Sequence, residues 1–150
     1  MANGRQTLLK TTCGNLVKSE AERKIDNWLF RHGWSTVYEP KVPFSDGSQL
    51  QPDWVLLPQN GICRPVIVEY WGLSVLRPNA AYWAKEAQPK YQRRRERKEA
   101  LYTTTPYYHY IGLQLPDLAQ LDSTLGAALD ALRCDAAEGC RCFPVQSEGE

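Results

Sequence analysis

The apolar run at residues 66–72, which reads Val-Ile-Val-Glu-Tyr-Trp-Gly, is the clearest pattern in the chain. A short run of this kind is typical of a strand that is buried on both faces. Because side chains alternate along a strand, Ile67, Glu69 and Trp71 are expected on the same face. An ionised carboxylate in such a strand is costly unless a cation or a hydrogen-bond donor meets it. The rest of the chain must therefore supply partners for Glu69.

An amphipathic helix is predicted over residues 17–32, upstream of that strand. Ser19 and Glu22 have the spacing of a capping box, and Gly33 is well placed to end the helix in the left-handed conformation. Glu22 falls at the border of the apolar stripe of this helix. The pattern thus places a carboxylate where the helix meets the core.

The remaining periodicity predicts further strands and helices on both sides of residues 66–72. Strands are expected at residues 34–42, 51–57 and 107–115, and a helix at residues 117–132. A long helix is expected to end at residue 102 and to begin at about residue 82, with Pro89 as a kink, or at Pro89 itself as a first-turn residue. The third strand, long helix and fourth strand form a crossover, which is expected to be parallel and right-handed. The element order is αβββαβα, which indicates an α/β fold with a mixed four-stranded sheet. Residues 1–15 are predicted to be a flexible arm, residues 16–133 the folded domain, and residues 134–150 an acidic tail that contains cysteines.

Charge is distributed unevenly along the 150-residue chain, although the net charge is only +1. Residues 85–98 carry seven Lys and Arg against two Glu, whereas residues 117–150 carry seven Asp and Glu against two Arg. The basic stretch suggests a surface that faces a polyanion, although a solvated helix face is the commoner cause of such a run.

No apolar segment approaches the length of a membrane span, and no signal-peptide core is visible, so an intracellular, cytoplasmic protein is expected. Its five cysteines should then be mostly reduced. Cys134, Cys140 and Cys142 cluster, but their spacing is not that of a zinc ribbon or finger and no His lies near them. Metal binding by this cluster is the less favoured interpretation.

Four residues could form one chemical site: Glu22, Asp53, Glu69 and Lys98. Each has an ordinary structural interpretation, since Glu22 and Asp53 fit a helix border and a strand entry, and Lys98 could extend its ammonium to solvent. On a helical wheel, however, Lys98 shares the apolar stripe of its helix, unlike the neighbouring cations. Together the four residues place two strand carboxylates, a helix carboxylate and an inward lysine around one sheet.

At these residues the chain resembles the PD-(D/E)XK, or restriction-endonuclease-like, nuclease superfamily, over roughly residues 16–130. The matching segments are residues 18–25 (Lys-Ser-Glu-Ala-Glu-Arg-Lys-Ile), Pro52-Asp53, residues 67–69 (Ile-Val-Glu), and residues 91–98 with Tyr102. The resemblance implies a three-layer α/β/α sandwich and a Mg²⁺-dependent DNA endonuclease of a homing, restriction or mobile-element kind. It is closest to small nuclease modules found alone or fused to helicases.

One position departs from the family pattern. The family places Lys two residues after the second acid, where this chain has Trp71. Branches that keep a Glu-x-x-Gly strand end supply the lysine from the following helix, which Lys98 fits. A degenerate, inactive site is the alternative that Trp71 leaves open.

The resemblance also implies roles for the site residues. Asp53 and Glu69 would be direct ligands of Mg²⁺, or of Mn²⁺ in its place, with the Tyr70 carbonyl as a third ligand. Glu22 would bind a second ion or a metal-bound water, and Lys98 would position the attacking water or neutralise the phosphate.

The basic helix is the predicted contact with the DNA backbone. Its candidate residues are Lys85, Lys90, Arg93, Arg94, Arg95 and Arg97. A single active site in one small domain implies a dimer or higher oligomer for a double-strand cut. Two other functions stay open: a non-catalytic DNA-binding or assembly module on the same fold, and a generic α/β domain with a solvated basic helix.

Overall fold

A mixed four-stranded sheet forms the centre of the protein, in a computed structural model that describes residues 7–134. Its strands are β3 (Thr36–Tyr38), β6 (Trp54–Leu56), β7 (Val66–Tyr70) and β8 (His109–Leu113), in that spatial order. The first three strands pair antiparallel, and β7 pairs parallel with β8. The predicted α/β class and the mixed sheet are therefore confirmed.

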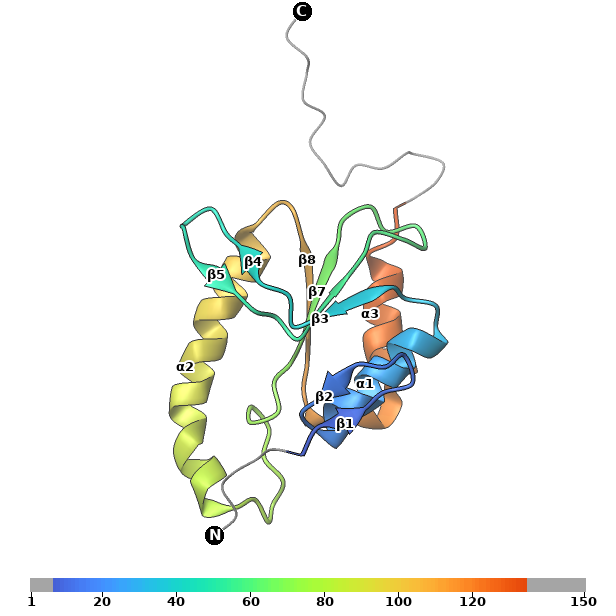
Figure 1. The fold of residues 1–150 in the computed structure, drawn as a ribbon. Coiled ribbons are helices and arrows are strands. Elements are labelled where there is room, and N and C mark those ends of the chain that lie inside the picture. The colour runs from blue at the N-terminus through green and yellow to red at the C-terminus, as the bar shows by residue number, and fades with distance from the viewer. Residues whose placement is uncertain (1–6, 135–150) are drawn as a thin grey trace, which may run out of the picture.

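Helices lie on both faces of this sheet (Figure 1). The helix α1 (Glu20–Arg31) lies on one side with the C-terminal helical segment, and α2 (Tyr82–Thr104) lies on the other. The side chains of β6 and β7 alternate between two apolar clusters accordingly. Trp54, Leu56, Val66 and Val68 belong to the cluster on the α1 side. Val55, Ile67 and Trp71 belong to the cluster on the α2 side, as the alternation predicted.

The start of α1 differs from the prediction. The helix begins at Glu20, because Ser19 is the N-cap and its hydroxyl accepts a hydrogen bond from the Glu22 N–H at 3.1 Å. Residues 16 and 17 belong instead to β2 (Leu16–Val17), which pairs with β1 (Leu9–Lys10). The predicted arm over residues 1–15 thus contains part of a hairpin that contacts α1. Gly33 follows the helix with φ of +78°, as expected of its left-handed stop.

Two further segments are more divided than the sequence pattern predicted. The expected strand at residues 34–42 ends at Tyr38, and β4 (Val42–Pro43) pairs with β5 (Gln49–Leu50) in a separate hairpin. The expected final helix is broken into a 3₁₀ helix η1 (Leu115–Gln120), a π-helical turn η2 (Asp122–Gly126) and α3 (Ala127–Ala131). Its leucines nevertheless face the core as predicted, at Leu118, Leu121, Leu125 and Leu129.

The long helix α2 begins at Tyr82 and contains Pro89 in its interior, so Pro89 is not a first-turn residue. Proline has no N–H to donate to the carbonyl one turn earlier, which leaves one helical bond unmade. No helix within residues 7–134 is long and apolar enough to cross a membrane. Cys134, the last described residue, lies with its Sγ 2.9 Å from the Sγ of Cys63, and the other two cysteines of the predicted cluster lie outside the described residues.

Candidate active site

Asp53 and Glu69 lie opposite each other at one edge of the sheet. The register of β6 and β7 pairs Trp54 with Val68, so the next step along the two strands brings Asp53 beside Glu69. The Asp53 N–H donates to Glu69 Oε1 at 2.9 Å, and the Tyr70 N–H donates to Asp53 Oδ2 at 2.7 Å. Each carboxylate is therefore fixed by the backbone of the other's strand. Both side chains are on the α2 face, because their neighbours Val55, Ile67 and Trp71 pack there.

Burial raises the pKa of both carboxyl groups well above the ordinary range. The Asp53 charge raises the pKa of Glu69 further. Lys98 opposes the rise at both residues, and its Nζ lies 4.0 Å from Glu69 Oε2. The two acids thus share one cation, which is too little positive charge for two buried carboxylates.

Lys98 reaches the acids from α2, as the wheel predicted, and it passes over Trp71. Its Nζ lies 5.8 Å from the centre of the Trp71 ring, within the range of a cation–π contact. The Trp71 indole N–H donates to the Tyr110 hydroxyl at 2.6 Å. A Cβ on Gly112 would lie 2.5 Å from that hydroxyl and 3.2 Å from the indole nitrogen, so a residue without a side chain is needed there. Trp71 therefore contacts Lys98, and it occupies the position at which the PD-(D/E)XK pattern has its lysine.

Glu22 lies near the pair but has other partners. Its carboxylate accepts hydrogen bonds from the Tyr38 hydroxyl at 2.8 Å and from the Ser19 hydroxyl at 3.2 Å. Its charge still contributes to raising the pKa of Asp53. The structure therefore brings Asp53, Glu69 and Lys98 together and leaves Glu22 beside them, held by α1 and β3.

Three residues near the pair had not been singled out from the sequence as site candidates. Glu39 has a positive φ of 49°, and its N–H donates to the Asp53 carbonyl at 2.8 Å. The Glu39 carboxylate forms an ion pair of 2.7 Å with Lys18, and the charges of Glu22 and Asp53 help to raise the pKa of that lysine. The buried Tyr102 hydroxyl makes no hydrogen bond of ordinary geometry, yet it lies close enough to Glu69 to lower the pKa of that carboxyl group. The positive φ of Glu39 is a strained conformation for a residue other than glycine, and such residues cluster at functional sites. This strain is visible in the backbone structure and not in the sequence.

Most of the predicted DNA-contacting cations on α2 are exposed, and Arg95 is the exception. Those at the surface are Lys85, Lys90, Arg93, Arg94 and Arg97. Arg95 turns inward, where it donates to Glu99 at 2.8 Å and to Gln114 at 3.0 Å. Its guanidinium also lies 5.4 Å from the centre of the Trp71 ring. Arg95 is therefore placed to hold Trp71 rather than to meet a phosphate.

Asp53 and Glu69 provide the hard oxygen donors that Mg²⁺ prefers. Their hydrogen bonds to the backbone occupy one oxygen of each carboxylate, which leaves a second oxygen on each. Across residues 7–134, no three His, Cys, Asp or Glu side chains form a ready-made cage for a metal. Two carboxylates without a full protein cage suit Mg²⁺, because this ion keeps several of its own waters.

The chemistry of the pair can thus be stated from its geometry: two buried oxygen donors, one lysine and a deficit of positive charge at the end of a strand. Comparisons with protein-family models, with curated proteins and with solved structures find no match, so a functional assignment depends on this geometry and on the sequence motifs.

Proposed function

We propose that this protein is a Mg²⁺-dependent DNA endonuclease that hydrolyses phosphodiester bonds at Asp53 and Glu69. One observation carries the proposal: the buried Glu69 and the half-buried Asp53 face each other across adjacent segments of the sheet, with Lys98 Nζ 4.0 Å from Glu69. An arrangement that raises the pKa of two adjacent acids is unfavourable for folding alone, and such arrangements concentrate at functional sites. A divalent cation would supply the missing charge.

The finer fold assignment belongs to the same proposal. Helices on both faces of the mixed sheet support a three-layer α/β/α sandwich of the PD-(D/E)XK type. Glu69 lies in β7 and Asp53 lies directly before β6, the antiparallel neighbour of β7, an arrangement that supports this assignment. The short pairs β1–β2 and β4–β5 would be additions to that core.

Each residue has a distinct role in the proposed reaction. Asp53 and Glu69 would hold Mg²⁺, or Mn²⁺ in its place, with the Tyr70 carbonyl as a further ligand. The bound ion would supply charge for the phosphate oxygens and make water more acidic. Lys98 lies between Glu69 and Trp71, and it would orient the attacking water or neutralise the phosphate. Glu22, held by Tyr38 and Ser19, would hold a water at the edge of the site.

The exposed cations of α2 would bind the DNA backbone without reading its sequence. Arg93, Arg94 and Arg97 lie on the same helix as Lys98, so a phosphate chain along this helix would lead to the acid pair. Because one domain holds one such site, a double-strand cut would require a dimer or two binding events.

Removal of either acid tests the proposal. Wild-type protein is expected to cut plasmid or branched DNA in Mg²⁺ or Mn²⁺ and to stop on addition of EDTA. Asp53→Ala and Glu69→Ala should each lower the cleavage rate by at least about a thousandfold, since each removes a metal ligand. Binding of labelled DNA in EDTA should change less than about threefold. Asp130→Ala, which removes an exposed carboxylate from α3, is the matched control and should cut normally.

Two results would contradict the proposal. Normal cleavage by either acid variant would remove the pair from the active site. Binding of DNA without cleavage in either metal would favour a non-catalytic DNA-binding module, for which Trp71 in the family's lysine position is the specific argument.

A further inference from the structure

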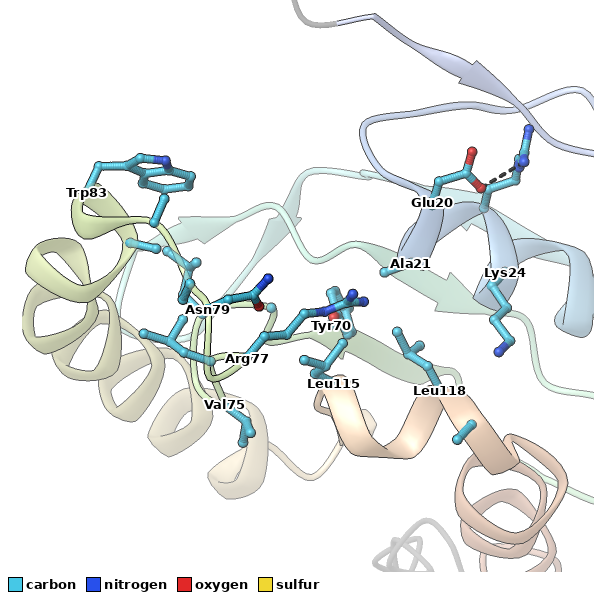
Figure 2. A pocket seen from close by; sticks show the side chains of 18 of the residues that line it. Glu20, Ala21, Lys24, Tyr70, Val75, Arg77, Asn79, Trp83, Leu115 and Leu118 are labelled. Atoms are coloured by element: carbon cyan, nitrogen blue, oxygen red, sulfur yellow. Dashed lines mark ion pairs between the residues drawn. The ribbon is translucent and has the colours of Figure 1, made fainter.

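A cleft of about 970 Å³ opens between α1, the segment 72–81 and η1 (Figure 2). Its lining includes Tyr70, the residue after Glu69, but neither acid of the pair. Tyr70 joins the two places, because its N–H holds Asp53 while its ring lines the cleft. In β7, Glu69 is on one face of the strand, and the next residue, Tyr70, lines the cleft. A ligand in the cleft would therefore contact the residue that follows Glu69, on the opposite side of β7 from the acid pair.

The lining combines an apolar floor with cations at the rim. Val75, Leu115 and Leu118 contribute to the floor, and Trp83 stands at the far end on the first turn of α2 (Figure 2). Trp83 is 66% exposed, so the face of its ring is accessible to a ligand. In Figure 2, Arg77 extends across the middle of the cleft and Lys24 enters from α1.

The cations of this rim carry charge that the protein does not neutralise. Within residues 7–134, no ion pair is formed by Lys24, Arg31 or Arg77. Two acids of the surrounding elements have other partners. Glu20 pairs with Arg23 at 2.7 Å, and Asp117 accepts a hydrogen bond from the Gln114 N–H at 2.7 Å. The cleft is therefore prepared for an anion that also has flat apolar surfaces.

We infer that the cleft binds an unpaired DNA strand that flanks the phosphate to be cut. A duplex hides the faces of its bases and presents only phosphates, so the apolar floor and Trp83 would have no role in binding it. An unpaired strand offers both parts, since its phosphates meet the cations and its bases stack on an aromatic ring and aliphatic side chains. The inference rests on the proposed function and makes it more specific: the substrate has single-stranded DNA next to the cut, as at a flap, a fork or another branch.

Binding in EDTA tests the strand site without relying on catalysis. The probe is a fluorescent thymidine 12-mer, compared with a blunt duplex of the same length. The paired change Lys24→Glu with Arg77→Glu should weaken binding of the single strand at least about tenfold, and Trp83→Ala about tenfold, since one stacked base contributes roughly 1–3 kcal/mol. Tyr82→Ala is the matched control, because this neighbour is even more exposed but does not line the cleft. Lys41→Glu controls for loss of surface charge elsewhere.

The outcomes separate this inference from the proposed nuclease activity. If the cleft variants bind the single strand as tightly as wild type, the inference is wrong, and a protein partner for the cleft becomes the better explanation. If the cleft variants no longer bind the single strand and the wild type cuts forked DNA beside the unpaired arm, both proposals are supported. If they lose the single strand and the wild type cuts no DNA, the strand site is supported and the cleavage proposal fails.

Discussion

Buried carboxylates on opposite faces of the same sheet have opposite electrostatic properties. Asp26, on α1, is 2% exposed and accepts hydrogen bonds from Trp54 Nε1 at 3.0 Å, Asn15 Nδ2 at 2.9 Å and Cys13 Sγ at 3.1 Å. Burial would raise the pKa of Asp26, but these donors outweigh it and hold the pKa below its usual value. At Asp53 and Glu69 burial prevails, and their pKa values are raised.

The two places meet at the start of β6, where Trp54 is its first residue and Asp53 directly precedes it. Trp54 points to the α1 face and donates to Asp26, whereas Asp53 belongs to the α2 face. Asp26 and Glu69 are equally buried, at 2% and 3% exposure, but Asp26 accepts three side-chain hydrogen bonds whereas Glu69 accepts one from the Asp53 N–H and has a neighbouring acid. A buried carboxylate whose oxygens are filled by donors stabilises the fold, whereas one with an open oxygen and a neighbouring acid is prepared to bind a cation.

The largest expected effect comes from removing the satisfied acid. Asp26→Ala leaves the buried Trp54 N–H and the half-buried Asn15 amide without this acceptor, and we expect it to lower the free energy of unfolding by about 3 kcal/mol. Asp53→Ala removes one of two repelling charges and should leave stability unchanged or slightly higher at pH 8. Urea denaturation of both variants in EDTA measures the difference. Equal destabilisation by the two substitutions would contradict the distinction between a structural and a functional acid.

The strand 66–72 shows how much of the site was accessible from the sequence. Its alternation correctly placed Glu69 and Trp71 on one face, and the wheel of the following helix correctly turned Lys98 toward them. Asp53 was predicted on the adjacent strand, and the antiparallel register places it opposite Glu69. These features follow from local periodicity, which a sequence displays directly.

Features that depend on distant contacts were not accessible in this way. Asp26 lies in the middle of a helix pattern, and its donors come from the hairpin β1–β2 and from β6. The positive φ of Glu39 and the inward turn of Arg95 depend on partners that lie far along the chain or in another element. The break in the final helix involves Gly126, where a Cβ would lie 3.2 Å from the Trp28 ring. Tertiary packing decides each of these details.

The pH dependence of stability should have opposite signs for the two kinds of acid. The pKa is raised to about 7 for Asp53 and about 8 for Glu69, so between about pH 4.5 and 8 the folded state holds protons that the unfolded state has released. Their contribution to stability therefore falls as pH rises through this window. Asp26 contributes stability above its ordinary pKa of 3.8 and loses it as the pH falls further.

Denaturation in EDTA at pH 6 and pH 8.5 measures the first of these slopes. We expect the wild type to lose about 2 kcal/mol relative to the double variant Asp53→Asn, Glu69→Gln, whose amides do not titrate. Mg²⁺ should restore stability to the wild type at pH 8.5 far more than at pH 6, because it binds the ionised pair. If the stability of the two proteins changed with pH in the same way, the pKa values of Asp53 and Glu69 would not be raised in the folded state.

The smallest expected effect concerns the single cation that the pair shares. Lys98 lowers the pKa of both acids, so Lys98→Met should move the midpoint of the stability loss upward by roughly half a pH unit to one unit. The same change should slow cleavage about tenfold, since it removes a charge beside the proposed phosphate position. Lys90→Met is the matched control, because it removes the same charge from an exposed position on the same helix. It should weaken DNA binding two- to threefold and leave the midpoint where it is. If the two lysine variants behave alike, the charge of Lys98 acts only as part of the general field of α2, and the acid pair has no dedicated cation.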